Sequence, residues 1–180
     1  MRIGYGYDSH RFAEGRRLVL GGVEFLGETG LAGHSDADVL VHAIIDALLG
    51  AAALGDIGSH FPDTDPRWKD ADSTELLAQV VKEVRGAGYK VGNVDATVIC
   101  ERPKLRPYVE LIRERLSEVM HVGKGRISVK GKTNEKLDDV GAGLGIEVHA
   151  VVLLEEGIGK REEGREKEKR HEDDRGDSDV

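Results

Sequence analysis

The sequence lacks most of the features that mark secreted, membrane-spanning or cysteine-rich metal proteins. It contains one cysteine, Cys100, among 180 residues, which excludes an intrachain disulfide and a thiolate cluster and suits a reducing cytosol. The longest apolar run, residues 43–54, is interrupted by Asp46 and is too short to span a bilayer. The first residues, MRIGYGYDSH, lack the apolar segment of a signal peptide. We therefore expect a cytoplasmic protein.

A surplus of basic residues is also missing. There are 26 Lys and Arg against 34 Asp and Glu, a formal net charge of −8, so no general basic surface is expected for nucleic acid. Apolar residues make up 39% of the chain, which is low for a globular protein. Much of this deficit lies in residues 156–180, which bury too little to offset their ordering entropy. We predict one domain over residues 1–155 and a disordered charged tail over residues 156–180.

The hydrophobic pattern predicts an α+β fold. Alternating apolar residues and a Gly-Gly turn indicate strands within residues 2–8, 17–25, 89–101, 126–132 and 146–155. Helical spacing and breaker residues indicate helices over about residues 36–54, 72–86 and 107–120. Ser35 or Asp36 is the expected N-cap of the first helix. The order of elements predicts a two-layer sandwich, with helices on one face of a mixed β-sheet.

Asp8 and His10 lie two residues apart at the end of the first predicted strand. This spacing puts both side chains on one face of a strand, where a carboxylate and an imidazole are suitable ligands for a divalent metal. A simple Asp–His hydrogen bond near a strand end is the alternative explanation. The pair alone does not decide between the two.

A polar pair, His34 and Ser35, opens the most unusual stretch of the chain. The helix that follows carries His42 on its first turns. Asp38 and Asp46, four residues before and after His42, lie on the same side of that helix, and either could accept the second N–H of a metal-bound imidazole. The alternative is a surface histidine in an i,i+4 charge pair.

An acidic loop follows this helix, with Asp56, Asp63 and Asp65 near Gly58 and Pro62. Acids in a rigid loop can hold hydroxyl groups or a metal ion. Asx turns are the simpler explanation, which accounts for some of these aspartates.

A local basic cluster, Arg102, Lys104 and Arg106, surrounds Pro103 in an otherwise acidic protein. It predicts the rim of an anion or nucleotide site. The alternative is the solvated start of a helix.

Five motifs occur together: GYDSH, HSDADVLVHAIIDALLGAAALGDIG, FPDTDP, RPK and KTNEKL. In this order they resemble the motifs of the 2-C-methyl-D-erythritol 2,4-cyclodiphosphate synthase family, the cyclising enzymes of the non-mevalonate isoprenoid pathway. The resemblance runs from Met1 to Glu155 and is most specific between His34 and Pro66. Family members are homotrimers with an active site at each subunit interface, so the resemblance implies this assembly.

The resemblance implies two metal ions. Asp8, His10 and His42 match the three protein ligands of a tetrahedral Zn²⁺ or another divalent transition metal. The fourth position of such a site is open to a phosphate oxygen of the substrate. Glu135 matches a ligand of a second ion, Mg²⁺ or Mn²⁺, which bridges the phosphates of the substrate diphosphate.

The resemblance also implies catalytic and substrate-binding residues. His34 and Thr133 match positions that stabilise the transition state, and Ser35 matches a phosphate-binding position. Residues 56–65 would hold the methylerythritol part, residues 100–106 the cytidine of the neighbouring subunit's site, and residues 132–135 the phosphates. The complete set that matches substrate-binding positions is Asp8, Ser9, His10, His34, Ser35, Asp56, Ile57, Gly58, Phe61, Pro62, Asp63, Thr64, Asp65, Cys100, Glu101, Arg102, Pro103, Lys104, Leu105, Arg106, Lys132, Thr133, Asn134 and Glu135.

The implied reaction converts 4-diphosphocytidyl-2-C-methyl-D-erythritol 2-phosphate to 2-C-methyl-D-erythritol 2,4-cyclodiphosphate. The 2-phosphate attacks the β-phosphorus in line and expels CMP. Because the nucleophile is already an anion, no strong general base is needed, and the site has to supply proximity and charge neutralisation.

Two other functions remain open at this point. A zinc-dependent phosphohydrolase would activate water and give a linear product. A non-catalytic cytidine-nucleotide-binding trimer would need neither metal, so the metal-ligand set argues against it. The chain also departs from many family members at Asp139 and Ala142, where they carry phenylalanine and arginine around a cavity on the trimer axis. A ring of aspartates there would repel an isoprenoid diphosphate.

Overall fold

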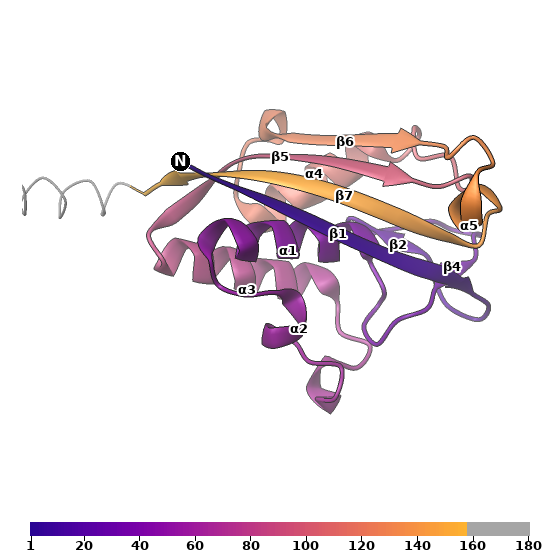
Figure 1. Cartoon of the computed structure of the whole chain (residues 1–180), viewed down its shortest axis with the longest axis horizontal. Helices are drawn as coiled ribbons and strands as arrows, with labels where there is room; N and C mark the ends of the chain where they lie inside the picture. The colour runs from indigo at the N-terminus through magenta and orange to yellow at the C-terminus, as the bar shows by residue number, and fades with distance from the viewer. Residues whose placement is uncertain (158–180) are drawn as a thin grey trace, which may run out of the picture.

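The computed structural model describes residues 1–157, which form a mixed sheet and a layer of helices on one of its faces (Figure 1). The two-layer α+β architecture predicted from the sequence is therefore confirmed. Residues 158–180, which make up most of the predicted tail, lie outside the described residues.

The main sheet has five strands in the order β4-β1-β7-β5-β6. Only the pair of β5 and β6 is parallel among the pairings of this sheet, and the other neighbours are antiparallel. A separate hairpin of β2 and β3 turns at Gly21 and Gly22, whose φ angles of 63° and 72° are those that such a turn requires. The strand bounds are β1 Arg2–Ala13, β2 Val19–Leu20, β3 Val23–Glu24, β4 Gly30–Leu31, β5 Tyr89–Ile99, β6 Ile127–Lys132 and β7 Gly145–Glu156.

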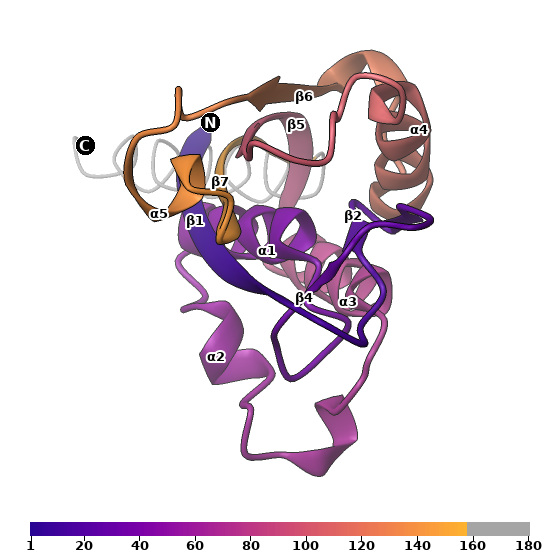
Figure 2. The same cartoon turned by 90° about the vertical axis from the view of Figure 1, so that its right-hand side faces the viewer.

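Three long helices form the second layer, and α1 lies between the sheet and α3 (Figure 2). The helix bounds are α1 Val39–Ala52, α2 Ile57–His60, α3 Ser73–Gly86, α4 Val109–Met120 and α5 Asp138–Gly141, with 3-10 turns at Pro66–Trp68 and Lys124–Arg126. None of the helices within residues 1–157 is both long enough and apolar enough to cross a membrane.

The first helix begins later than the sequence predicted. Asp38, not Ser35 or Asp36, is its N-cap, and the Asp38 carboxylate accepts the Val41 N–H at 3.1 Å. The chain cannot be helical before this point because Ala37 has a φ of 59°, which is outside the right-handed helical region. His34 and Ser35 therefore belong to the loop that precedes α1.

Glycines let β1 pack directly on the backbone of α1. A Cβ atom on Gly4 would lie 1.9 Å from the Ala47 carbonyl oxygen, and one on Gly6 would lie 2.0 Å from that of Ala43. Since alternate residues of a strand share a face, Asp8 and His10 continue the same helix-facing row. The close approach of strand and helix brings these two side chains to His42.

Among the residues that the structure describes, none covers the opposite face of the sheet. Large apolar or aromatic side chains on it are exposed, with 74% of Ile3, 59% of Tyr5, 43% of Tyr7 and 43% of Val151 accessible. These residues lie on β1 and β7, which are neighbours in the sheet. A contiguous apolar surface of this kind is typical of a protein interface.

Candidate metal centre and substrate pockets

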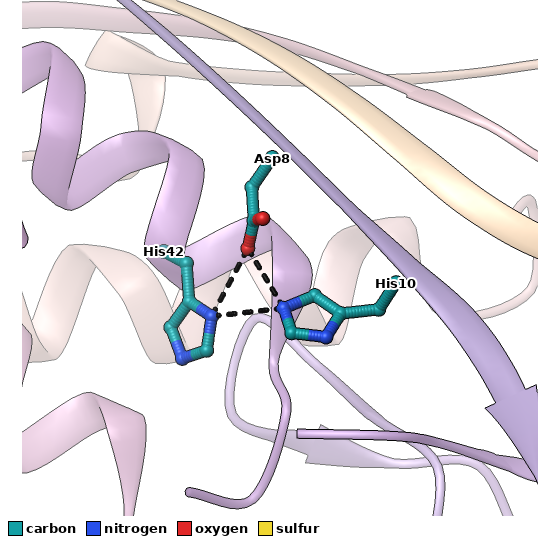
Figure 3. Close-up of side chains that lie close together, drawn as sticks. All are labelled: Asp8, His10 and His42. Atoms are coloured by element: carbon teal, nitrogen blue, oxygen red, sulfur yellow. Dashed lines mark hydrogen bonds and ion pairs between the residues drawn. The ribbon is translucent and has the colours of Figure 1, made fainter. Parts of the chain in front are cut away.

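Asp8, His10 and His42 form a compact group between β1 and α1 (Figure 3). Asp8 Oδ2 lies 2.9 Å from His10 Nε2 and 3.1 Å from His42 Nδ1, and the two nitrogens are 3.4 Å apart. One ligand atom from each residue lies within 4.8 Å of the others, so the group could hold a metal ion. The prediction that Asp8 and His10 share a face is confirmed.

His42 is buried, with 9% of its surface accessible, so the surface-histidine alternative is wrong. The predicted contact of its second nitrogen with Asp38 or Asp46 is also wrong. His42 Nε2 lies 3.1 Å from Ser35 Oγ and 3.0 Å from Ser73 Oγ. Asp38 is turned away towards the Gly21 and Gly22 N–H groups, and Asp46 accepts the Ile57 N–H at 2.8 Å.

Electrostatics favour a charged carboxylate in this group. Burial acts to raise the pKa of Asp8, but hydrogen bonds from His10 and His42 and their positive charge outweigh it, so the pKa lies well below the usual range. Burial acts to lower the pKa of His10, but the hydrogen bond and charge of Asp8 prevail and raise it. His10 Nδ1 lies 2.5 Å from the Ala32 carbonyl oxygen, which orients Nε2 towards Asp8. One carboxylate and two oriented imidazoles are a donor set that fits a divalent metal.

A cavity of about 400 Å³ adjoins this group. Its lining contains many of the predicted residues from the loop before α1 and the loop after it. It also contains Trp68 and Leu76, which the sequence analysis missed as site residues, and Asp46, whose pKa is raised chiefly by burial. The lining residues are Asp8, His10, Gly33, His34, Ser35, His42, Asp46, Ile57, Gly58, Phe61, Pro62, Asp63, Trp68 and Leu76.

Asp56 and Asp65 make hydrogen bonds to residues two or three positions away in sequence. Asp56 caps α2 by accepting the Ser59 hydroxyl at 2.7 Å and the Ser59 N–H at 2.8 Å. Asp65 binds the Arg67 guanidinium, with the Arg67 Nη2 atom 2.6 Å from Oδ2. These hydrogen bonds lower the pKa of both carboxyl groups. The simpler turn-and-cap explanation therefore describes the contacts of these two aspartates.

The predicted cytidine residues line a different cavity, of about 380 Å³. It lies where β5 and β6 end beside the start of α4. Its lining residues are Cys100, Pro103, Lys104, Leu105, Arg106, Val109, Gly131, Lys132 and Thr133. This set has no member in common with the lining of the cavity at the metal group. Glu101 and Arg102 face a third cavity instead, together with Lys136.

The loop after β6 is held by side chains of the same region. The Thr133 hydroxyl donates to Glu135 at 2.7 Å, and the Glu101 carboxylate accepts the Asn134 and Lys136 N–H groups at 3.1 and 3.3 Å. Glu135 and Lys136 have φ angles of 50° and 62°, a conformation that costs roughly 1–3 kcal/mol per non-glycine residue. Glu135 is exposed and lies outside the Asp8–His10–His42 group.

Fold and side chains together define an α+β protein with a cavity beside a group of side chains that could hold a metal ion. The sequence model of the YgbB family matches residues 1–155, and the chain belongs to this family. Two relatives named 2-C-methyl-D-erythritol 2,4-cyclodiphosphate synthase support this assignment. The one from Gloeobacter violaceus is 59% identical over 156 residues, 87% of this chain and 96% of that protein. The one from Trichlorobacter lovleyi is 58% identical over 154 residues, 86% of this chain and 98% of that protein.

Solved structures agree with the sequence comparison. A CDP-bound structure of 2-C-methyl-D-erythritol 2,4-cyclodiphosphate synthase matches this fold with a TM-score of 0.79 and 42% identity. The match covers 86% of this chain and 100% of that one. The family resemblance predicted from the five motifs is therefore confirmed.

Proposed function

We propose that the protein converts 4-diphosphocytidyl-2-C-methyl-D-erythritol 2-phosphate to 2-C-methyl-D-erythritol 2,4-cyclodiphosphate and CMP. The observation that carries this proposal is the Asp8–His10–His42 group, which adjoins a cavity of about 400 Å³. It occurs in a chain whose relatives carry the name of that synthase at 58–59% identity.

Zn²⁺ is the proposed ion at Asp8, His10 and His42, and Mg²⁺ or Mn²⁺ is the proposed ion at Glu135. Bound ions would neutralise the phosphate charges and act as Lewis acids on phosphate oxygens. The chain's own part is to orient the ligand atoms. Asp8 presents a charged oxygen, and Ala32 and the serine hydroxyls contact the outward nitrogens of the two imidazoles.

The substrate would be folded over the first cavity. His34 and Thr133 would stabilise the transition state, and Ser35 would hold a phosphate close to the metal group. Residues 56–65 would hold the methylerythritol part, and residues 132–135 would flank the phosphates. The 2-phosphate then lies in line with the β-phosphorus, so that the site supplies the proximity that the ring closure needs.

A homotrimer with active sites between subunits would unite the two halves of this site. Residues 100–106 would accept the cytidine of the neighbouring subunit's site, in keeping with the CDP-bound form of the solved relative. Two observations support the assembly: the predicted residues fall into separate cavities within one chain, and the open face of the sheet carries exposed Tyr5 and Val151.

Two further expectations from the sequence remain predictions. Limited proteolysis would test the division into a domain over residues 1–155 and a charged tail over residues 156–180. Cell fractionation would test the cytoplasmic location.

Substitution of one metal ligand tests the proposed function. We expect His42→Ala to lower kcat/KM for CMP release by about 10³-fold or more, because metal stabilisation of the transition state is worth several kcal/mol and each 1.4 kcal/mol is tenfold. His121→Asn is the matched control, since His121 is exposed with a φ of 53°, a conformation that asparagine tolerates. If His42→Ala released CMP as fast as the control, the proposal would be wrong. Cytidine binding without turnover in the wild-type protein would indicate a non-catalytic binder.

A further inference from the structure

Ser73, at the start of α3, lies directly behind the candidate metal centre. Its side chain is fully buried, and its hydroxyl oxygen is 3.0 Å from His42 Nε2. The same hydroxyl forms a hydrogen bond with the Asp36 carboxylate. Asp36 also accepts the Ser73 N–H at 3.0 Å and the Asp38 N–H at 3.1 Å. Two loops that are distant in sequence are thereby joined next to His42.

The direction of these hydrogen bonds follows from the inventory of donors. An ionised carboxylate only accepts hydrogen bonds, so the Ser73 O–H has to point at Asp36. The Ser73 oxygen then offers a lone pair to His42 Nε2, and a short contact is favourable only if that nitrogen carries the proton. Ser35 Oγ, which accepts the Ala37 N–H at 3.2 Å and lies 3.1 Å from the same nitrogen, is a second acceptor compatible with this arrangement.

We propose that Asp36 and Ser73 are positioning residues that keep the proton of His42 on Nε2. His42 Nδ1, which faces Asp8 and His10, is then the nitrogen whose lone pair a bound metal ion would take, in place of the hydrogen bond to Asp8. Neither residue touches the reacting atoms, and both act through the imidazole. The inference rests on the proposed metal site and extends it to two residues that the sequence motifs did not indicate as part of that site.

The tautomer can be measured directly in metal-free wild-type protein. Nitrogen-15 NMR of histidine-labelled protein distinguishes a protonated Nδ1 from a protonated Nε2, and the His42 signals are assigned from their absence in His42→Asn. We expect a proton on Nε2 of His42, whether or not Nδ1 also donates to Asp8. In Asp36→Ala the Ser73 O–H is free to rotate, and we expect a measurable population in which Nε2 of His42 carries no proton. A predominant form with a proton on Nδ1 alone in the wild-type protein would overturn the proposal.

Metal affinity gives a second measurement. Loss of a hydrogen-bond partner behind a metal-bound histidine commonly weakens metal binding by about 10–100-fold. We expect this loss of Zn²⁺ affinity in both Ser73→Ala and Asp36→Ala, measured by competition with a chromogenic chelator. Thr74→Val is the matched control, because Thr74 is the buried neighbour at the same helix start and its hydroxyl donates to Asp72. We expect its Zn²⁺ affinity to stay within about twofold of wild type, well below the loss expected behind a ligand.

The possible outcomes separate this inference from the proposed function. If the wild-type protein binds Zn²⁺ and the Ser73 and Asp36 variants bind it equally tightly, the positioning role is wrong while the metal site stands. An equal loss in Thr74→Val would likewise overturn the positioning role, because it would show a general effect of destabilising this helix start. If the wild-type protein and His42→Ala show the same Zn²⁺ titration, both the metal site and this inference are wrong.

Discussion

At the residue scale, Asp38 makes the stability of the fold depend on pH. Complete burial, aided by the charge of Asp36, raises its pKa to about 6, although the N–H groups of Gly22, Gly21 and Val41 oppose this shift. The unfolded chain has the ordinary value of about 3.9. The folded state thus holds the proton more tightly, so this contribution to stability is complete below about pH 4 and is lost as pH rises to about 6.

Asp38→Asn removes this titration and provides the test. The quantity to compare is the free energy of unfolding of the wild type minus that of the variant. We expect this difference to fall by roughly 2–3 kcal/mol between pH 4 and pH 7. Urea unfolding of the metal-free proteins at several pH values measures this difference. A difference that stays constant with pH would contradict the raised pKa. The variant also loses hydrogen bonds of the carboxylate. This loss changes the difference in unfolding free energy by the same amount at every pH, so it does not alter how the difference varies with pH.

The positions of some site residues could be predicted from the sequence, and the contacts of others could not. The spacing of Asp8 and His10 predicts a shared face, because strand geometry alone fixes it. The partners of His42 could not be predicted in the same way. Ser73 is 31 residues away along the chain, and the pattern around it indicates only a helix start. Only the packing of α3 beside α1 brings its hydroxyl to the imidazole.

At the element scale, the contact between β1 and α1 determines the geometry of the metal group. Gly6→Ala would force a Cβ atom to within 2.0 Å of the Ala43 carbonyl oxygen and 2.7 Å of the Ala47 nitrogen. Both are backbone atoms of a buried helix, so strand and helix would have to separate. We expect a loss of about 3 kcal/mol in the free energy of unfolding and weaker Zn²⁺ binding, because Asp8 would move away from His42.

Gly50→Ala is the matched control for this substitution. Gly50 lies on α1 itself, and an added Cβ atom meets nothing within 4 Å. Replacing a glycine inside a helix by alanine stabilises by roughly 0.5–1 kcal/mol. Urea unfolding and Zn²⁺ titration of the two variants provide the comparison. Equal stabilities for Gly6→Ala and Gly50→Ala would contradict the close packing of β1 on α1.

Most long elements were predictable because their periodicity is local. The three long helices and the strands β1, β5, β6 and β7 all follow from apolar spacing, although β1 extends beyond the predicted end to Ala13. The short strand β4 was missed, since its two residues, Gly30 and Leu31, contain too little pattern. The cap of α1 was misplaced because three candidate cap residues precede the helix, and only the backbone at Ala37 decides among them.

At the scale of the whole molecule, the open face of the sheet is the proposed trimer contact. Val151 lies on the central strand β7 opposite Tyr5 of β1, and both side chains are exposed in the single chain. We expect Val151→Glu to dissociate the trimer, because each copy would bury a carboxylate without a partner. Light scattering after size exclusion should then give a particle close to the chain mass of 19.6 kDa.

Leu111→Glu is the control for this assembly test. Leu111 is also exposed, at 54%, but lies on α4 in the helix layer. We expect the Leu111 variant to remain a trimer and both variants to keep the wild-type circular dichroism spectrum. If the Val151→Glu protein were still a trimer, the trimer contact would lie on another surface.

The sequence alone does not reveal which face of the sheet is open. The first strand, β1, alternates Tyr with Gly, and the glycine face is the one that packs inward.

The central claim is that the site closes a ring, and the most direct test is phosphorus NMR of the reaction products. Purified protein is incubated with 4-diphosphocytidyl-2-C-methyl-D-erythritol 2-phosphate, with and without a chelator. The account predicts CMP together with a pair of coupled signals from a cyclic diphosphate, and both should disappear on chelation. CMP with a linear phosphate product would contradict it and indicate a phosphohydrolase, because the substrate would then react with water and not with its own 2-phosphate.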